Sequence, residues 1–281
     1  MDLLKLAFRI SRVRFWLYLG GTYLAGYAFG VDRIKEFINI EFFFYLFLFM
    51  IPANIFLYGV NDLYDTETDE KNPKKGEYEH KLQDNEKKNL NNIVLLSFLF
   101  FIGAVIFNFN ITELILLVIF IYLSYYYSAK PFRFKARPLL DFSSNALYFI
   151  PGLIGYHQAA DTLPSIIIII SLFLWTAAMH LFSAVPDIEF DKKVGDMTSA
   201  VKLGRKGSLL LCFLFWLGFV IILLTQGFYL YLTIILFIYP LIPLLLIIFP
   251  KVNINKVYKI YPYLNAILGL VTFLHIIVLE K

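Results

Sequence analysis

Residues 58–72 read YGVNDLYDTETDEKN and place a run of acidic side chains directly behind an apolar segment. Five carboxylates occupy this stretch: Asp62, Asp65, Glu67, Asp69 and Glu70. Charged groups at the boundary of an apolar phase are costly unless something compensates them. The fold therefore depends on what surrounds this stretch, and the function on what these carboxylates bind.

The chain around this stretch has the composition of a membrane protein. Of its 281 residues, 59% are hydrophobic and only 16% are charged, and the mean hydropathy is +0.70. This balance excludes an ordinary soluble domain. A membrane-crossing helix needs roughly 20 mostly apolar residues. Nine stretches meet this requirement: 15–31, 38–60, 90–108, 111–128, 139–158, 164–185, 207–226, 228–249 and 258–279.

The distribution of Lys and Arg predicts the orientation of these helices. Short connections on the cytoplasmic side of a membrane are enriched in basic residues. The N-terminal stretch and every second connection carry 22 of the 25 basic residues. We therefore expect an all-α, polytopic membrane protein with nine transmembrane helices in one bundle, forming a single domain over residues 1–281. Its N-terminus lies in the cytoplasm, its C-terminus outside, and its long charged loops form a cytoplasmic cap.

The same distribution bears on partners and on processing of the chain. The basic charge falls where anionic lipid headgroups would attract it, so the pI of about 8.9 needs no nucleic acid. The basic start followed by an apolar run also has the pattern of a signal peptide. Removing the first apolar segment would leave the topology one helix short, so we expect it to be retained.

The first acidic stretch has the residue types and the spacing of a divalent-metal site. Asn61, Asp65 and Asp69 are spaced four residues apart, so a helix that continued past its apolar part would place them on one face, with Asp62 alongside. Carboxylates held this closely repel one another unless a cation neutralises them. Carboxylate and amide oxygens are hard ligands, which favours Mg²⁺ over Zn²⁺.

A second acidic stretch follows the sixth expected helix. It reads SAVPDIEFDKKVGD, with Asp187 and Asp191 again four residues apart. Mg²⁺ prefers one or two protein carboxylates together with substrate phosphates. Two acidic helix ends on one face of the membrane therefore predict a cleft that binds a diphosphate through metal ions. A charged loop beside a helix is more often only a solvated cap, but the matched spacing of two such stretches favours the metal site.

Both stretches resemble the motifs of a known family. NDLYDTETD is similar to the N-D-x-x-D-x-x-x-D motif, and DIEFDKKVG to the D-x-x-x-D-x-x-x-G motif, of the UbiA superfamily of intramembrane prenyltransferases. The resemblance implies Mg²⁺-dependent transfer of an isoprenyl chain from its diphosphate to a lipophilic acceptor. It also implies two sets of metal ligands, one of Asn61, Asp62, Asp65 and Asp69 and one of Asp187 and Asp191.

Basic and aromatic residues near the same membrane face are candidates for binding the diphosphate and the allylic cation. Lys130 and Arg133 lie closest to the end of the fourth expected helix, and Lys202 follows the second motif. The other candidates are Lys135, Arg205, Arg12 and Arg14, which by default are charges that set the topology. Aromatic faces stabilise cations, and Tyr64 and Tyr127 are the aromatic residues best placed to do so.

Three longer stretches resemble the lycopene elongase branch of the family, which adds an isoprenyl unit to a carotenoid end. They lie at residues 10–26, 127–152 and 179–204. An apolar acceptor agrees with expected helices whose inner halves are nearly bare of polar groups, with His180, Ser183, Asn145 and Asn54 as the main exceptions. We expect His180 to be a packed core histidine, and the alternative is a base that takes the final proton.

Two alternatives remain open from the sequence. A quinone precursor or another aromatic or lipid acceptor would keep the chemistry and change the acceptor. A membrane cation transporter would use the carboxylates along an ion path, although its acids would be expected in mid-helix. For the enzyme we expect the cell membrane of a bacterium or archaeon, with the active site on the cytoplasmic side and the polar loop after the first motif as a lid over the diphosphate.

Overall fold

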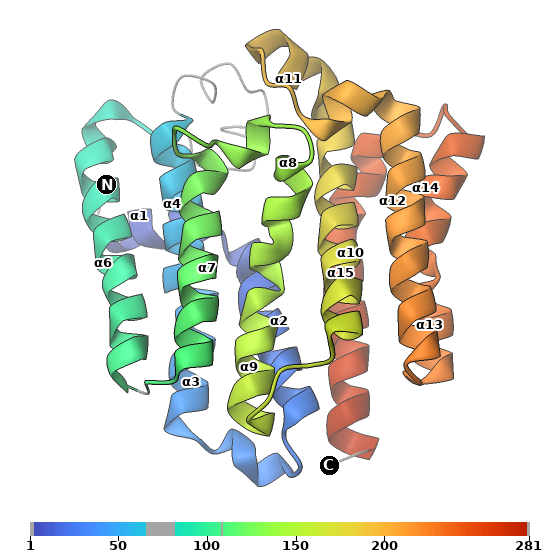
Figure 1. The fold of residues 1–281 in the computed structure, drawn as a ribbon. Coiled ribbons are helices and arrows are strands. Elements are labelled where there is room, and N and C mark those ends of the chain that lie inside the picture. The colour runs from blue at the N-terminus through green and yellow to red at the C-terminus, as the bar shows by residue number, and fades with distance from the viewer. Residues whose placement is uncertain (1–2, 66–81, 108, 280–281) are drawn as a thin grey trace. The chain divides into compact units, whose positions relative to one another are not determined.

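The computed structural model describes residues 3–65, 82–107 and 109–279, and within these ranges the chain is helical and contains no strand (Figure 1). This confirms the all-α prediction. The described chain forms two compact units. Unit 1 consists of residues 1–133, 147–163 and 275–281, and unit 2 consists of residues 134–146 and 164–274.

Unit 1 is a group of helices, most of which are apolar and run side by side. In chain order they are α1 (Leu3–Ile10), α2 (Trp16–Gly30), α3 (Ile40–Met50), α4 (Pro52–Tyr64), α6 (Lys87–Phe107), α7 (Ile111–Ser128) and α9 (Ile150–Ala160), with short 3₁₀ turns η1 (Val13–Phe15), η2 (Ile34–Phe37) and η3 (Asp84–Glu86) between them. The closest packing joins α2 to α9 and α4 to α6. Its core is aromatic, with Tyr23, Tyr45, Phe49, Phe101 and Phe120 fully buried.

Unit 2 contains most of the second half of the chain. Its elements are η4 (Phe134–Ala136), α8 (Leu140–Ser143), the start of η5 (Ser144–Tyr148), α10 (Ile166–Ala184), η6 (Val185–Asp187), α11 (Ile188–Val194), α12 (Ser199–Thr225), α13 (Leu230–Leu236), α14 (Ile238–Ile248) and α15 (Ile254–Leu279) up to Leu274. Helix α12 packs against α10 and α14. Trp216 and Tyr261 stack with ring centroids 5.5 Å apart inside the core of this unit.

Seven helical segments in the described ranges are long and apolar enough to cross a membrane. They are Ile40–Tyr64, Lys87–Phe107, Ile111–Ser128, Ile166–Val194, Ser199–Thr225, Leu230–Ile248 and Ile254–Leu279. The first joins α3 and α4 across a break at Ile51, where Pro52 starts the new helix. Two of the nine expected spans are shorter. Helix α2 has 15 residues, and the span expected at 139–158 is divided into α8, η5 and α9.

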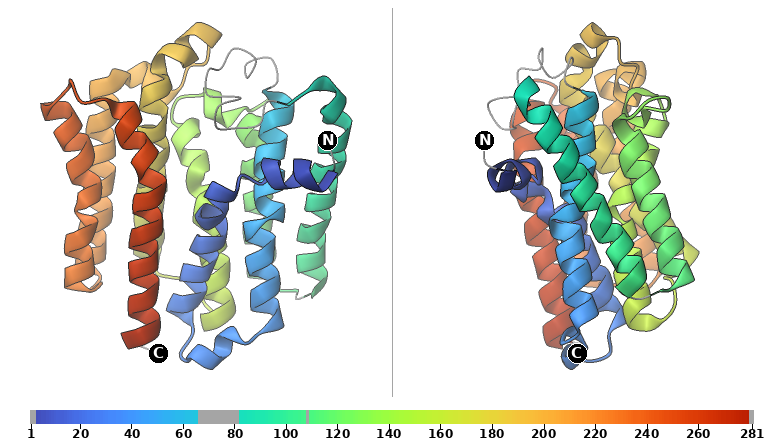
Figure 2. Two further views of the ribbon diagram at one scale, coloured as in Figure 1. Left: turned by 180° about the vertical axis from the view of Figure 1, so that it is seen from behind. Right: turned by 90° about the vertical axis from the view of Figure 1, so that its left-hand side faces the viewer.

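Helix α1 was not expected from the sequence, where the N-terminal stretch counted only as basic charge. Leu6 and Ile10 are buried, whereas Leu4 and Phe8 are exposed. The helix contacts α4 and α6 and lies across their axes (Figure 2). Its eight residues are too few to span a membrane, so hydropathy over a long window does not detect it. Its end brings Arg12 to α4.

The contact between α2 and α9 depends on glycine. A Cβ at Gly26 would collide with the backbone of Gly152, and a Cβ at Gly155 would collide with that of Tyr23. We therefore expect Gly26→Ala to destabilise unit 1 by about 1–3 kcal/mol, because neither backbone can move without disturbing the pair. Gly21→Ala on the same helix is the matched control, since its nearest neighbour atom is Leu17 Cβ at 3.5 Å. Equal unfolding temperatures of the two variants in detergent would contradict this account.

Candidate functional site

The first acidic segment (residues 61–65) ends helix α4. The helix stops at Tyr64 and Asp65 is its C-cap, with its N–H donating to the carbonyl of Asn61 at 3.0 Å. Asp62 and Asp65 are only 2% and 3% exposed. A carboxylate at the C-terminal end of a helix is also disfavoured by the helix dipole. Both acids therefore need compensating charge nearby. Asp69 lies outside the described residues, as does most of the loop expected to form a lid.

Arg12 compensates Asp62. Its Nη2 lies 2.9 Å from Asp62 Oδ1, and its guanidinium sits over the ring of Tyr58, 4.4 Å from the ring centroid. Tyr58 is one helical turn before Asp62, and its hydroxyl lies 3.3 Å from that of Tyr148. Arg12 has a positive φ of 48°, between α1 and η1. The turn after α1 thus holds a cation against the first acidic segment.

The chain that follows α7 provides the second cation. Arg133 Nη2 lies 3.7 Å from Asp65 Oδ1, and the N–H of Arg133 donates to Ala129 O at 2.9 Å. Ser128, the last residue of α7, accepts a hydrogen bond of 2.8 Å from Asn61 Nδ2. This bond uses the amide nitrogen of Asn61, so a metal ion would bind Asn61 through its amide oxygen.

The remaining candidates of unit 1 lie around these contacts. Lys130 is exposed, and Tyr127 is half-buried in the last turn of α7. Tyr64 is 45% exposed, and its hydroxyl lies 2.9 Å from that of Tyr125. Unit 1 therefore brings one amide, two buried carboxylates and two guanidinium groups together at one end of α4.

These donors fit a Mg²⁺ ion that is completed by a substrate. No group of three or more His, Cys, Asp or Glu side chains in the part of the chain that the structure describes is arranged to hold a metal alone. Mg²⁺ seldom uses such an all-protein cage and takes one or two carboxylates together with substrate phosphates. Two carboxylates and one amide oxygen match that requirement. Each carboxylate has lone pairs for both an Arg and a metal.

The second acidic segment (residues 187–191) belongs to unit 2. Asp187 ends η6 and Asp191 lies in α11, and both are half-buried. Thr198 Oγ1 donates to Asp191 Oδ2 at 3.3 Å. Lys202 is exposed in the first turn of α12, and His180 is half-buried on α10. That the two acidic segments face each other stays a prediction from the sequence.

Asp141 is a buried carboxylate that sequence reasoning missed. It is fully buried at the start of α8, and its oxygens accept hydrogen bonds from the N–H and the hydroxyl of Ser199, each 2.6 Å long. Asp141 also interacts electrostatically with His180. The signal was present, because Asp141 is an acid inside an apolar stretch expected to span the membrane.

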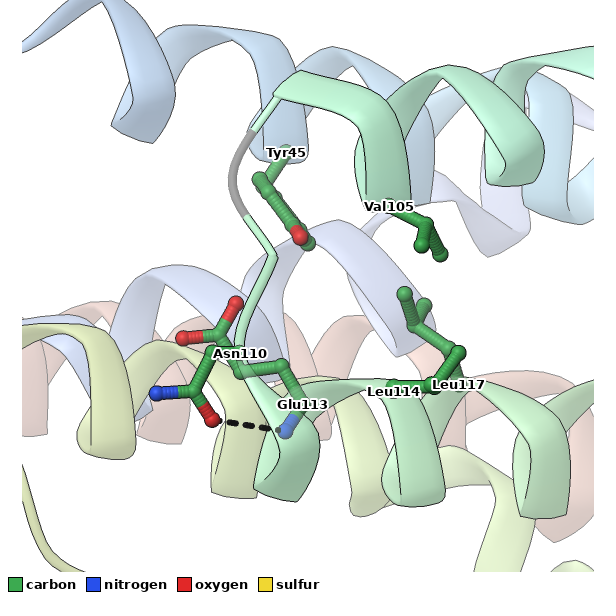
Figure 3. Close-up of a pocket in the computed structure, with 6 residues that line it drawn as sticks. All are labelled: Tyr45, Val105, Asn110, Glu113, Leu114 and Leu117. Atoms are coloured by element: carbon green, nitrogen blue, oxygen red, sulfur yellow. Dashed lines mark hydrogen bonds between the residues drawn. The ribbon is translucent and has the colours of Figure 1, made fainter.

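A polar cluster lies at the opposite end of α7, where Glu113 is about 22 Å along the helix from Ser128. Glu113 and His157 are 2% and 7% exposed, and their nearest polar atoms are 3.3 Å apart. Gln158 Nε2 donates to Glu113 at 3.0 Å. The hollow beside this cluster has Tyr45 and Val105 on one side and Asn110, Glu113, Leu114 and Leu117 on the other (Figure 3). Glu113 and His157 lie near the ends of α7 and α9, so the expectation of few polar groups in the inner halves of the helices stays a prediction.

The sequence and the fold of the chain are similar to those of known proteins. The sequence profile of the UbiA prenyltransferase family matches residues 19–275. A lycopene elongase/hydratase of Haloferax volcanii is 35% identical over 268 residues, covering 93% of this chain and 85% of that protein. A lycopene elongase/hydratase of Corynebacterium glutamicum is 30% identical, covering 77% of this chain and 76% of that protein.

Two solved structures share the fold. A UbiA homologue from Archaeoglobus fulgidus, solved with GPP and Mg²⁺, superposes with a TM-score of 0.73 at 20% identity, covering 97% of this chain and 99% of that one. A digeranylgeranylglyceryl phosphate synthase gives the same TM-score at 22% identity, covering 99% of this chain and all of that one. At these identities the similarity concerns the fold.

Proposed function

Because the chain belongs to the UbiA prenyltransferase family, we propose that this membrane enzyme uses Mg²⁺ to transfer an isoprenyl group from an allylic diphosphate to the end of a carotenoid. The observation that carries the metal-dependent chemistry is the buried pair Asp62 and Asp65, each facing a guanidinium group at the end of α4. The apolar acceptor is supported by relatives named lycopene elongase/hydratase.

In this reaction the acidic and amide side chains have one role, and the two arginines have another. Asn61, Asp62 and Asp65 would hold one metal ion, and Asp187 and Asp191 the other. When bound, Mg²⁺ supplies positive charge that offsets the charge developing on the leaving diphosphate. Arg12 and Arg133 compensate the charge of the buried carboxylates, and their positive charge would attract the phosphate oxygens of the substrate.

The bond changes follow from the substrates. The allylic C–O bond breaks, and its electron pair leaves with the diphosphate. The allylic cation is attacked by the π electrons of a terminal double bond of the acceptor, which forms the new C–C bond and a tertiary cation. Loss of a proton to a base, or addition of water followed by loss of a proton, completes the product. Apolar helices exclude bulk water from the first cation.

The distribution of charge supports an orientation in the membrane. The N-terminal stretch and both acidic segments belong to the parts of the chain that carry 22 of the 25 basic residues. Under the positive-inside rule, this distribution supports an active site at the cytoplasmic face of the cell membrane. The family membership argues against the cation transporter.

The experiment that identifies the acceptor measures turnover by the purified protein in lipid vesicles, with Mg²⁺, dimethylallyl diphosphate and one candidate acceptor at a time. We expect product with lycopene, and none with a menaquinone precursor or hydroxybenzoate. We also expect EDTA to abolish turnover and Mg²⁺ to restore it, because the carboxylates cannot stabilise a leaving diphosphate without a cation. Turnover only with an aromatic acceptor would mean that the acceptor is a quinone precursor or a similar aromatic compound and not a carotenoid. Full activity in EDTA would contradict the proposed requirement for Mg²⁺.

A further inference from the structure

The carboxylate of Asp141 is buried in unit 2 and is engaged by the beginning of another helix. Its side chain is 0% exposed, and it accepts hydrogen bonds from Ser199 N, Ser199 Oγ and Phe142 N at 2.6, 2.6 and 2.9 Å. A buried carboxylate costs several kcal/mol unless hydrogen bonds or a cation compensate it. The three hydrogen bonds compensate the Asp141 carboxylate, and they hold their donors, Ser199 and Phe142, against it.

What Asp141 fixes is the start of α12. Ser199 is the first residue of that helix, and its hydroxyl also accepts a bond of 2.8 Å from the N–H of Leu139. The N–H of Asp141 in turn donates to Arg137 O at 2.9 Å. We call Leu139, Asp141 and Ser199 the Asp141 latch. It joins the end of the basic loop before α8 to the loop that follows the second acidic segment.

One residue, Thr198, connects the Asp141 latch to Asp191. Thr198 precedes Ser199 and is the N-cap of α12, with Oγ1 accepting from Val201 N at 3.2 Å. The same hydroxyl donates to Asp191 Oδ2 at 3.3 Å. The N–H of Asp196 donates to Asp191 O at 2.9 Å, which closes the turn between α11 and α12. The position of Ser199 therefore determines where the Thr198 hydroxyl meets the Asp191 carboxylate.

We propose that Asp141 is a positioning residue for Asp191, acting through Ser199 and Thr198 to aim that carboxylate at the metal–diphosphate complex. This rests on the proposed function, in which Asp191 holds a metal ion. Partners that orient a ligating side chain contribute strongly to metal affinity, and their loss commonly costs about 10- to 100-fold. A purely structural role, holding α8 against α12, would lower stability without changing the concentration of Mg²⁺ that the protein needs.

The test compares Asp141→Asn and Thr198→Val with two matched variants. Thr198→Ser keeps the hydroxyl that reaches Asp191. Ser165→Ala removes the N-cap of α10 in the same unit, where the Ser165 side chain accepts from Ile168 N at 3.4 Å. This cap lies at the opposite end of α10 from η6 and α11. Two quantities are measured. One is the Mg²⁺ concentration giving half-maximal turnover, and the other is Mg²⁺-dependent binding of dimethylallyl thiolodiphosphate by calorimetry, which needs no turnover.

We expect Asp141→Asn and Thr198→Val to raise the half-maximal Mg²⁺ concentration by about 10-fold or more, with a matching loss in calorimetry. Thr198→Ser and Ser165→Ala should stay within about twofold of the unsubstituted protein, in keeping with no change at Asp191. In an Asp191→Asn background, Thr198→Val should add no further effect, because the carboxylate that it orients is already gone.

The outcomes separate this inference from the proposed function. If the unsubstituted protein neither binds the thiolodiphosphate with Mg²⁺ nor turns over, the proposed function fails. If it does both, and Asp141→Asn and Thr198→Val keep its Mg²⁺ requirement, the positioning role fails. Should Asp141→Asn not fold, the Thr198 pair decides alone, because the serine and valine variants differ at the hydroxyl in question.

Discussion

Asp65→Asn is expected to reduce prenyl transfer by roughly 100- to 1,000-fold, the cost of removing one group that stabilises developing charge in an active site. Asparagine has the size of aspartate but lacks the negative charge that would hold a metal ion at the end of α4. Arg133 cannot replace that charge, since it has the same sign as the metal. The measurement is the initial rate with saturating dimethylallyl diphosphate and Mg²⁺, with circular dichroism to show that the helices are intact.

Asp161→Asn is the matched control for this substitution. Asp161 is an exposed residue of the same unit, at the C-cap of α9, with a positive φ of 52° that asparagine adopts readily. It should leave the rate unchanged. A rate for Asp65→Asn equal to that of Asp161→Asn would remove the first acidic segment from the mechanism.

The second acidic segment is tested by Asp187→Asn under the same conditions. If both segments hold metal ions against one diphosphate, this variant should lose activity by a similar factor. Normal activity of Asp187→Asn beside an inactive Asp65→Asn would reduce the proposal to a single metal site.

The sequence predicted the helices well where hydropathy is continuous and less well where the helix breaks. The expected spans 111–128 and 164–185 correspond closely to α7 and α10. The span 139–158 instead breaks into α8, η5 and α9. Hydropathy measures average preference for an apolar phase, so it does not report a break in helical hydrogen bonding inside an apolar stretch.

Some parts of the candidate site could be predicted from the sequence, and others could not. The acidic residues could be found because their spacing repeats in two stretches of the chain. The pairing of Arg12 with Asp62 could not, because the two residues are 50 positions apart and depend on how α1 turns into α2. In the sequence Arg12 is one of four basic residues of an N-terminal stretch, all of which satisfy the positive-inside rule equally.

Arg12→Ala is expected to destabilise unit 1 by about 3–5 kcal/mol, because it leaves Asp62 buried without its cation. The side chains of the pair are 12% and 3% exposed, so water cannot take over the role of the guanidinium. The cation–π contact with Tyr58 is lost as well. The measurement is the unfolding temperature in detergent, together with the yield of monodisperse protein.

Two further variants separate the ion pair from other effects of the substitution. Arg14→Ala removes an exposed guanidinium two residues away and should change the unfolding temperature little. Adding Asp62→Asn to Arg12→Ala should restore part of the lost stability, because the uncompensated charge disappears with the carboxylate. The double variant should nevertheless remain inactive, since it lacks a metal-binding carboxylate. If Arg12→Ala were as stable as Arg14→Ala, compensation of Asp62 by Arg12 would be wrong, and the turn after α1 would have no part in forming the site.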